Sequence, residues 1–375
     1  MNKKAENKTI LFFNTNKAWG GGEKWHLEIA SALFRQGCKP LMFCHENGQL
    51  FKEAQHSGFL CLPIKVNNLS FLNIFKILKL AAWIRNSNID IIIMNLPADL
   101  KFAGLAARIA KVPRIIYRRG SAIPIKNTLL NRFLFRSVVT DILVNSEETR
   151  KTILSNNENL IDKNRIHLIF NGINIDEYDA QSNKSFYNKK EGELVIGNAG
   201  RMDNQKGQGD LLLLGEKLKN DGFIFKMIIA GEGKLKAELT ERAKSLDLSE
   251  LVMFPGFIKN IKSFMESIDV FVLPSRWEGF GYVLAEAMAS AKPIVAYNVS
   301  SNPELVIDMK NGFLVEKGNI NELYNRIQKL LNDTELRKQF GENGRRIVHE
   351  KFDFNKNLEE LKEWLEVSRQ SSVGS

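Results

Sequence analysis

Short apolar runs alternate with longer amphipathic stretches along the first half of the chain. The runs have the length of buried strands, and the stretches between them are long enough for helices. This rhythm predicts a parallel sheet covered by helices on its faces. The predicted strands of this half are residues 10–13, 40–43, 89–94, 114–117, 142–144 and 166–169.

A polar stretch at residues 181–192 interrupts the rhythm, and a second series of apolar runs follows it. We therefore expect an α/β protein with two doubly wound parallel-sheet domains, residues 1–180 and 193–352, joined by this linker. Asn357–Leu365 is amphipathic and predicts a helix, followed by a loose tail from Arg369. The strands predicted for the second domain begin at Leu194 and continue at residues 225–230, 251–254, 270–273 and 293–296.

Composition agrees with two soluble domains, because 375 residues with 44% hydrophobic content can build ample cores. The three cysteines, Cys38, Cys44 and Cys61, form no Cys-x-x-Cys pair, which favours reduced thiols in the cytoplasm. The apolar run Thr9–Phe13 is too short for the core of a signal peptide. The histidines lack ligand spacing and no Asp-x-Asp occurs, so we expect no metal site and no cofactor.

The segment around Glu278 carries the strongest functional signal. It follows the predicted strand Val270–Leu273 and contains Gly279 and Gly281, which let a ligand approach the backbone at the start of a helix. Free N–H groups and the positive end of the helix dipole favour a phosphate there. Glu278 precedes this helix and Glu286 lies inside it, so each can accept hydrogen bonds from sugar hydroxyls. Alternatively, Glu278 complements the helix dipole and Glu286 is a solvated surface residue.

A second segment complements the first. The predicted strand that begins at Leu194 runs into Gly200 and Arg201, with Lys206 five positions further on. Open parallel sheets bind ligands at the carboxyl ends of their strands, so both cations are expected at a diphosphate. Each charge-assisted bond would contribute roughly 1.5–3 kcal/mol.

Together these motifs resemble the retaining glycosyltransferases of family four, which have the two-domain GT-B fold. The resemblance extends into the first half of the chain and covers most of residues 9–350. The segments that carry it are Gly20–Glu23, Val144–Ser146, Ile169–Ile173, Gly200–Gly207, Ile229–Gly233, Phe254–Phe257 and Glu278–Glu286.

The resemblance implies a role for each matching residue. Arg201 and Lys206 would hold the diphosphate of a nucleotide-sugar donor, Glu286 its ribose, and Glu278 the transferred sugar. Many relatives have a histidine before a glycine at the end of an N-terminal strand, where this chain has Arg119, which stays protonated and cannot act as a base. The further expected donor-binding positions are Gly21, Gly22, Gly231, Gly233, Phe257, Gly279, Phe280 and Gly281.

Positive charge is concentrated in the first half. Residues 1–190 contain 28 Lys and Arg against 15 Asp and Glu, whereas the rest of the chain contains 25 against 28. Residues 101–136 carry nine cations and no acid, and residues 71–85 form a second basic amphipathic segment. Such segments can bind an anionic membrane, with Lys126, Arg132 and Arg136 over Phe133 or Phe135. Alternatively, their apolar faces pack on the sheet and the cations are solvated.

The cysteine pattern, the lack of metal-ligand spacing and the basic segments predict a cytoplasmic, metal-independent enzyme, peripheral on the inner face of the plasma membrane, and the resemblance implies its reaction. It would transfer a sugar with retention from a nucleoside-diphosphate donor to a glycan or glycolipid of cell-surface polysaccharide or lipopolysaccharide. Residues 1–180 would bind the acceptor and residues 193–352 the donor, while the helix in residues 353–375 would cross back to the first domain. Two alternatives are a non-catalytic sugar-nucleotide or glycan-binding partner of another transferase and a phosphorylase-like enzyme. A nucleic-acid partner is not expected, because no nucleic-acid-binding motif accompanies the basic residues.

Overall fold

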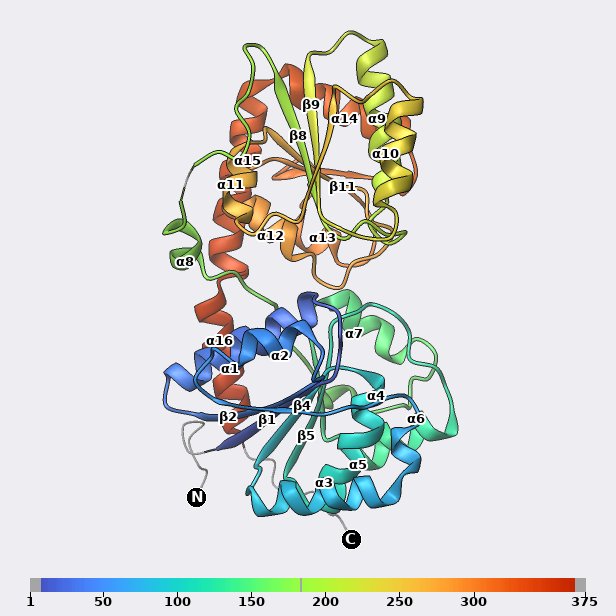
Figure 1. Cartoon of the computed structure of the whole chain (residues 1–375), viewed down its shortest axis with the longest axis vertical. Coiled ribbons are helices and arrows are strands. Elements are labelled where there is room, and N and C mark those ends of the chain that lie inside the picture. Colours follow the sequence, from blue (N-terminus) through green and yellow to red (C-terminus); the bar gives the residue numbers. More distant parts are fainter. Residues whose placement is uncertain (1–7, 183, 368–375) are drawn as a thin grey trace. The chain divides into compact units, whose positions relative to one another are not determined.

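The structure is a computed structural model that describes residues 8–182 and 184–367. Its chain forms two compact units (Figure 1). Unit 1 is built from the residues up to Ile169 and from Asn357 onward, and unit 2 is Phe170–Lys356. The chain thus leaves unit 1 at Ile169, before the polar stretch 181–192, and returns to it at Asn357.

Unit 1 contains a seven-stranded parallel sheet with the order β3-β2-β1-β4-β5-β6-β7. The strands are β1 (Thr9–Asn14), β2 (Lys39–Cys44), β3 (Leu60–Pro63), β4 (Ile91–Met94), β5 (Arg114–Arg119), β6 (Asp141–Val144) and β7 (Ile166–Leu168). Its helical segments are α1 (Gly21–Arg35), α2 (Gln49–Ala54), η2 (Ser70–Leu72), α3 (Ile74–Asn86), α4 (Pro97–Asp99), η3 (Leu100–Gly104), α5 (Leu105–Ile109), α6 (Leu129–Phe133), η4 (Leu134–Val138), α7 (Glu147–Leu154) and η5 (Lys163–Arg165).

Unit 2 contains a six-stranded parallel sheet with the order β10-β9-β8-β11-β12-β13. The strands are β8 (Leu194–Ala199), β9 (Phe225–Ala230), β10 (Val252–Gly256), β11 (Val270–Leu273), β12 (Ile294–Tyr297) and β13 (Gly312–Val315). Its helices are α8 (Ile175–Asp179), α9 (Gln208–Asn220), α10 (Lys236–Ser245), α11 (Ile261–Glu266), α12 (Tyr282–Ala289), α13 (Asn302–Leu305), α14 (Ile320–Asn332) and α15 (Thr334–Lys351), and α16 (Phe354–Glu366) then leads back to unit 1.

The two parallel sheets confirm the predicted α/β class. Central strands such as β1 and β11 are buried on both sides, which explains why their sequences are continuous apolar runs rather than alternating ones. Helices cover both faces of the unit 2 sheet, where two separate apolar clusters form. The sequence did not predict β3 and β13, which are four-residue strands at the sheet edges.

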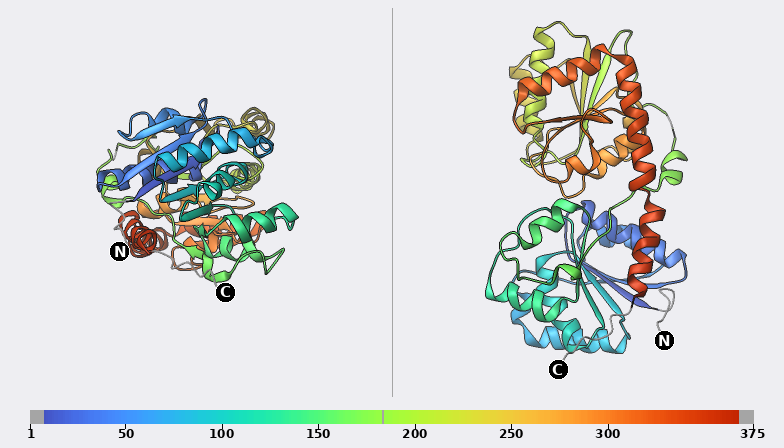
Figure 2. Two further views of the ribbon diagram at one scale, coloured as in Figure 1. Left: turned by 90° about the horizontal axis from the view of Figure 1, so that it is seen from below. Right: turned by 180° about the vertical axis from the view of Figure 1, so that it is seen from behind.

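Helix α16 follows α15 directly (Figure 2). Its residues from Asn357 onward belong to unit 1. Lys8 Nζ donates to the carbonyl oxygen of Leu365 at 2.7 Å. Arg114 donates to the carbonyl oxygen of Trp364 at 2.7 Å and stacks over the indole ring at 4.3 Å. The predicted helix Asn357–Leu365 lies within α16, and the expected loose tail from Arg369 lies outside the described residues.

Candidate functional site

The candidate site of unit 2 lies where its chain reverses direction across the sheet. From β8 the chain proceeds to β9 and β10 on one side, and from β11 to β12 and β13 on the other. Because β8 and β11 are adjacent parallel strands, the loops that follow them lie side by side at the carboxyl edge. Such a switch point is where open α/β sheets bind ligands. The loop after β8 contains Arg201 and Lys206, and the loop after β11 contains Glu278.

Gln205 joins the two loops. Its side-chain Nε2 donates to the carbonyl oxygen of Trp277 at 3.0 Å, and its own carbonyl accepts from the Arg276 amide at 2.7 Å. Arg201 donates to Gln205 Oε1 at 3.2 Å. Gln205 thus positions Arg201 against the loop after β11. This residue could not be predicted from the sequence, because a neutral amide carries no charge signal of its own.

Lys206 and Glu278 form an ion pair across the two loops. Lys206 Nζ lies 2.6 Å from Glu278 Oε1, with 14% of the lysine and 5% of the glutamate side chain exposed. A carboxylate this buried requires a compensating charge, which Lys206 supplies. The ammonium has three donors, so it can hold Glu278 and still bind a second acceptor. Residues predicted for the diphosphate and for the sugar are therefore in direct contact.

Three glycines allow the loops of this site to pack backbone against backbone. Gly207 has φ +65°, and a Cβ there would lie 2.1 Å from the Pro274 carbonyl oxygen. At Gly231, with φ +133°, a Cβ would lie 1.9 Å from the carbonyl oxygen of Gly200. A Cβ at Gly233 would meet the Met202 carbonyl oxygen at 2.3 Å. Gly231 and Gly233 thus fix the course of the loop after β8, a role that the sequence analysis did not anticipate.

Helix α12 begins at the same edge. Gly281 is its N-cap with φ +78°, a left-handed conformation that favours glycine. The side chain of Phe280 is buried and packs on Phe352 with ring centroids 5.5 Å apart, so only its backbone can reach a ligand. Glu286 lies on the second turn of α12 and is half-buried.

Two further predicted donor-binding residues of unit 2 lie on loops. Gly279 comes two residues before the N-cap of α12 and is half-buried. Phe257 follows β10 and exposes 74% of its surface. Its ring is therefore accessible to a ligand.

The remaining predicted residues belong to unit 1. Arg119 ends β5 and donates to the carbonyl oxygen of Ile123. Gly21 and Gly22 begin α1, where a Cβ on Gly22 would lie 2.5 Å from Asn95 Nδ2. The structure therefore brings the ten predicted residues of unit 2 to its loops and to α12, and leaves Gly21, Gly22 and Arg119 on the other unit.

Within residues 8–182 and 184–367, no three His, Cys, Asp or Glu side chains form a group that could hold a metal ion. None of the helices in that part of the chain has both the length and the apolar character needed to cross a bilayer.

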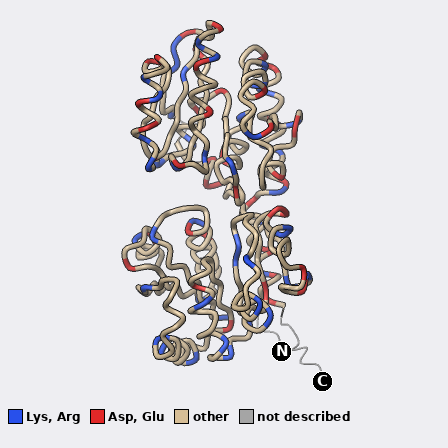
Figure 3. The backbone as a smooth tube through the Cα atoms, turned by 90° about the vertical axis from the view of Figure 1, so that its right-hand side faces the viewer, with Lys and Arg blue, Asp and Glu red and all other residues tan. Residues whose placement is uncertain are grey.

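The basic stretch 101–136 does not form one continuous surface, although Lys and Arg are frequent along unit 1 (Figure 3). Arg114 and Arg118 are buried in β5. Phe135 is buried against Tyr117, whereas Phe133 is 51% exposed, so of the two predicted aromatic residues only Phe133 is accessible to lipid. Five exposed large apolar residues of this unit instead lie close together in sequence around η2 and α3. We call them the α3 patch, defined as Leu69, Leu72, Ile74, Phe75 and Leu78.

Two family models match adjacent parts of the chain. Residues 19–177 match the model described as Glycosyltransferase Family 4, and residues 179–347 match Glycosyl transferases group 1. The chain belongs to the family-four glycosyltransferases. This places the loops around Lys206 and Glu278 in the group 1 region and Arg119 in the family 4 region.

Relatives and solved structures agree with this assignment. An uncharacterized glycosyltransferase of Methanocaldococcus jannaschii is 36% identical over 65% of this chain and 66% of its own length. The N-acetylgalactosamine-N,N'-diacetylbacillosaminyl-diphospho-undecaprenol 4-alpha-N-acetylgalactosaminyltransferase of Campylobacter jejuni is 29% identical over 72% of this chain and 75% of its own length. HepE of Anabaena has the same fold, with a TM-score of 0.81 at 22% identity over 95% of this chain and 99% of that one. The chain thus has the GT-B fold of these glycosyltransferases.

Proposed function

We propose that this family-four glycosyltransferase transfers a sugar from a nucleoside-diphosphate donor to a glycan or glycolipid acceptor of the cell surface. The observation that carries this proposal is the arrangement of Arg201, Lys206 and Glu278 at the switch point of unit 2. Two cations beside a buried carboxylate suit a diphosphate linked to a polyhydroxylated sugar. HepE was solved in complex with UDP, which supports a nucleoside diphosphate as the leaving group.

The chemical step needs stabilisation of the charge that develops on the departing diphosphate. Arg201, Lys206 and the amides at the start of α12 would supply it. Glu278 would hold Lys206 in place and accept a hydroxyl of the transferred sugar. We propose retention, in which the acceptor oxygen forms its bond to the anomeric carbon on the face that the phosphate oxygen leaves, and that phosphate oxygen takes the acceptor proton. The cations would make a metal ion unnecessary.

Relatives and the surface of unit 1 support the proposed acceptor class. The named Campylobacter jejuni enzyme acts on a diphospho-undecaprenol-linked glycan, which supports a lipid-linked acceptor for this chain. The α3 patch exposes large apolar side chains, with 82% of Phe75 accessible. Lys76 and Lys79 are exposed beside it, and the sequence has no acid between Glu53 and Asp90. Apolar side chains flanked by unopposed cations suit an anionic bilayer. We propose that this patch binds the inner face of the plasma membrane.

A donor panel tests the proposal. The protein is incubated with a series of nucleotide sugars and a glycolipid extract, and release of nucleoside diphosphate is followed by chromatography with and without a chelator. One donor should be consumed in an acceptor-dependent way, equally in the presence of the chelator, and NMR of the product should show the anomeric configuration of the donor. Binding of a donor without turnover on any acceptor would favour a non-catalytic partner of another transferase instead. Loss of activity in chelator that magnesium or manganese restores would contradict the metal-independent step.

A further inference from the structure

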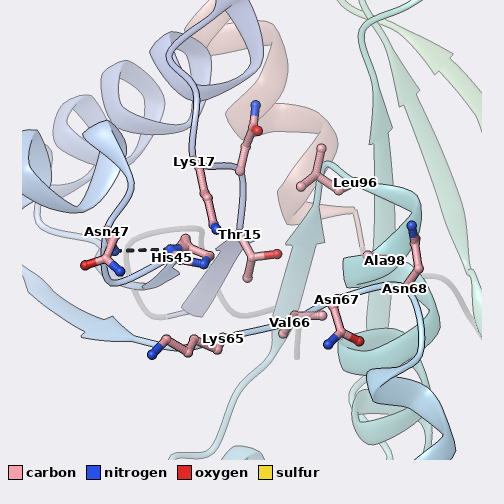
Figure 4. A pocket seen from close by; sticks show the side chains of 11 residues that line it. Thr15, Lys17, His45, Asn47, Lys65, Val66, Asn67, Asn68, Leu96 and Ala98 are labelled. Atoms are coloured by element: carbon pink, nitrogen blue, oxygen red, sulfur yellow. Dashed lines mark hydrogen bonds between the residues drawn. The ribbon is translucent and has the colours of Figure 1, made fainter.

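Unit 1 contains a pocket of about 580 Å³ above the carboxyl ends of its strands (Figure 4). Its volume is in the range of about 300–1,000 Å³ typical of small-molecule sites. None of the residues that line it is acidic. They are Thr15, Asn16, Lys17, His45, Asn47, Lys65, Val66, Asn67, Asn68, Leu96 and Ala98.

The pocket lies at the switch point of the unit 1 sheet. From β1 the chain proceeds to β2 and β3 on one side, and from β4 to the remaining strands on the other. Thr15–Lys17 follow β1, and Leu96 and Ala98 follow β4, so the adjacent ends of these two strands supply one wall. Loops after β2 and β3 supply His45 and Lys65. This unit therefore repeats, with its own residues, the topology that forms the site of unit 2.

Lys17 directs a charge into this pocket. Among the residues that the structure describes, no carboxylate forms an ion pair with it, and Figure 4 shows its ammonium pointing toward Thr15 and His45. Lys65 lies at the rim, where its Nζ is 2.5 Å from Glu46 Oε1. The unopposed charge inside the pocket is therefore that of Lys17.

His45 adds a directed neutral donor. Burial, and then the positive charge of Lys17, lower the pKa of His45, so the ring is neutral near pH 7. Its Nδ1 accepts from the Asn47 amide at 3.1 Å, which fixes the remaining proton on Nε2. A neutral ring held in this tautomer can donate a hydrogen bond from Nε2–H to a ligand, and it does not take a proton from that ligand.

Thr15 presents the opposite polarity. Its hydroxyl donates to Asp99 Oδ1 at 2.5 Å, and its amide donates to Asp99 Oδ2 at 3.2 Å. Because the hydroxyl proton is used on the carboxylate, the remaining lone pairs of Thr15 Oγ1 are free to accept. The pocket thus combines a cation and an N–H donor with an acceptor for a hydroxyl group, a combination that matches a phosphorylated sugar.

We propose that this pocket binds a phosphoryl group carried by the glycan acceptor, through Lys17 and His45, with Thr15 accepting from a neighbouring sugar hydroxyl. This inference rests on the proposed glycosyltransferase function and adds the acceptor's anionic group to it. Val66–Asn68 form part of the pocket wall, and the next residue in the chain, Leu69, is the first residue of the α3 patch. A phosphoryl group in the pocket would thus be close along the chain to the surface proposed to contact lipid, as a lipid-linked sugar diphosphate requires.

Calorimetric titration of the full chain with glucose 1-phosphate and with pyrophosphate tests the pocket. The donor site is first saturated with the nucleoside diphosphate found by the donor panel, so that it does not take up the probe. Lys17→Gln should weaken probe binding by about ten- to a hundredfold, the usual value of one charge-assisted hydrogen bond. Lys17→Arg should restore part of it. Lys52→Gln, on α2 outside the pocket lining, is the matched control and should bind like the parent.

Phosphatidylcholine vesicles with and without a polyprenyl diphosphate distinguish the source of the phosphoryl group. Tighter, Lys17-dependent binding to the lipid diphosphate would identify a lipid-linked acceptor, whereas Lys17-dependent binding of glucose 1-phosphate alone would identify a soluble phosphorylated glycan. Unchanged binding of every probe in Lys17→Gln would overturn the inference. In that case nucleoside-diphosphate binding at unit 2 would remain intact, and only its separate loss would count against the glycosyltransferase function.

Discussion

Lys206 Nζ lies 2.6 Å from Glu278 Oε1, and this contact joins the loops after β8 and β11 through two largely buried side chains. The two residues therefore depend on each other, because removal of either one leaves the other's charge poorly solvated. A diphosphate that binds Lys206 would have to share the ammonium with Glu278. This coupling links donor binding to the position of the carboxylate that would hold the sugar.

The first prediction concerns this pair. Lys206→Ala should lower turnover by about two to three orders of magnitude, because it removes a charge that stabilises the leaving diphosphate. It should also lower the free energy of unfolding by about 3–5 kcal/mol, since Glu278 stays buried without its partner. Adding Glu278→Gln should restore much of the stability but not the turnover. Steady-state kinetics and chemical denaturation measure the two effects.

Lys244→Ala is the control for this prediction. Lys244 pairs with Glu241 on the surface of α10, where both side chains are more than half exposed, so its loss should change neither quantity measurably. Near-normal turnover in Lys206→Ala would refute the assigned diphosphate site.

The second prediction concerns the glycine that brings the two loops together. Gly207→Ala should abolish donor binding and destabilise unit 2, because its Cβ would lie 2.1 Å from the Pro274 carbonyl oxygen at a positive φ. Gly209→Ala, inside α9, would meet only the movable end of Arg242 at 3.1 Å and should be tolerated. Thermal unfolding and nucleotide titration of the two variants provide the comparison. Equal behaviour of both would mean that the loop contact is not required.

The sequence identified Arg201, Lys206 and Glu278 because each follows a strand-like apolar run, and the carboxyl ends of parallel strands are where these sheets bind ligands. It did not predict their mutual contact, since the adjacency of β8 and β11 depends on strand order, which a linear pattern does not contain. Gln205 was missed for lack of a charge. The edge strand β3 was missed because it is partly exposed, which weakens its apolar signal, and the edge strand β13 was not predicted either.

The basic segments show the same limit of prediction from a linear sequence pattern. Their composition alone could not separate cations that face solvent from Arg114 and Arg118, which the sheet buries. The pocket around Lys17 was also not predicted, because its residues come from four separate loops and no two of its charged side chains are close in sequence.

The third prediction concerns Asp99. Burial raises the pKa of this carboxyl from 3.8 to about 7, against the hydrogen bonds from Thr15 that lower it. A raised pKa means that the folded state holds the proton more tightly than the unfolded state. Stability should therefore fall as pH rises from about 4 to about 7 and then level off.

Asp99→Asn should remove this loss of stability with rising pH, because the amide oxygen can still accept from Thr15 and never becomes charged. Relative to the parent, the variant should gain up to about 4 kcal/mol of unfolding free energy between about pH 4 and pH 8. Denaturant titrations at both pH values measure the gain, with the exposed Asp176→Asn as control. A pH-independent difference between Asp99→Asn and the parent would show that the carboxyl is ionised throughout.

The fourth prediction concerns the membrane. Replacing Leu72 and Phe75 by serine should abolish binding to anionic vesicles and leave nucleotide binding intact, because both side chains are exposed and make up part of the α3 patch. Binding of the parent should weaken with salt, since screening shortens the reach of Lys76 and Lys79.

The matched comparison replaces Lys126, Arg132 and Arg136 by glutamate. These cations lie on the other basic segment, where Leu134 and Phe135 are buried, so this variant should lose less vesicle affinity than the serine variant. The opposite order, measured by co-sedimentation, would move the membrane contact from the α3 patch to the region of α6.

The fifth prediction tests the central claim that the loops after β8 and β11 form a nucleotide-sugar site. Arg201 is the residue for this test, because 58% of its side chain is exposed, and its partner Asp203, 3.5 Å away, is less buried than Glu278 and accepts from the Gln205 amide as well. A nucleoside diphosphate is titrated calorimetrically into the parent, Arg201→Ala and the surface control Lys244→Ala. We predict that Arg201→Ala weakens binding by about ten- to a hundredfold at unchanged stability, while the control binds like the parent. Equal affinity of all three proteins for the nucleoside diphosphate would contradict it.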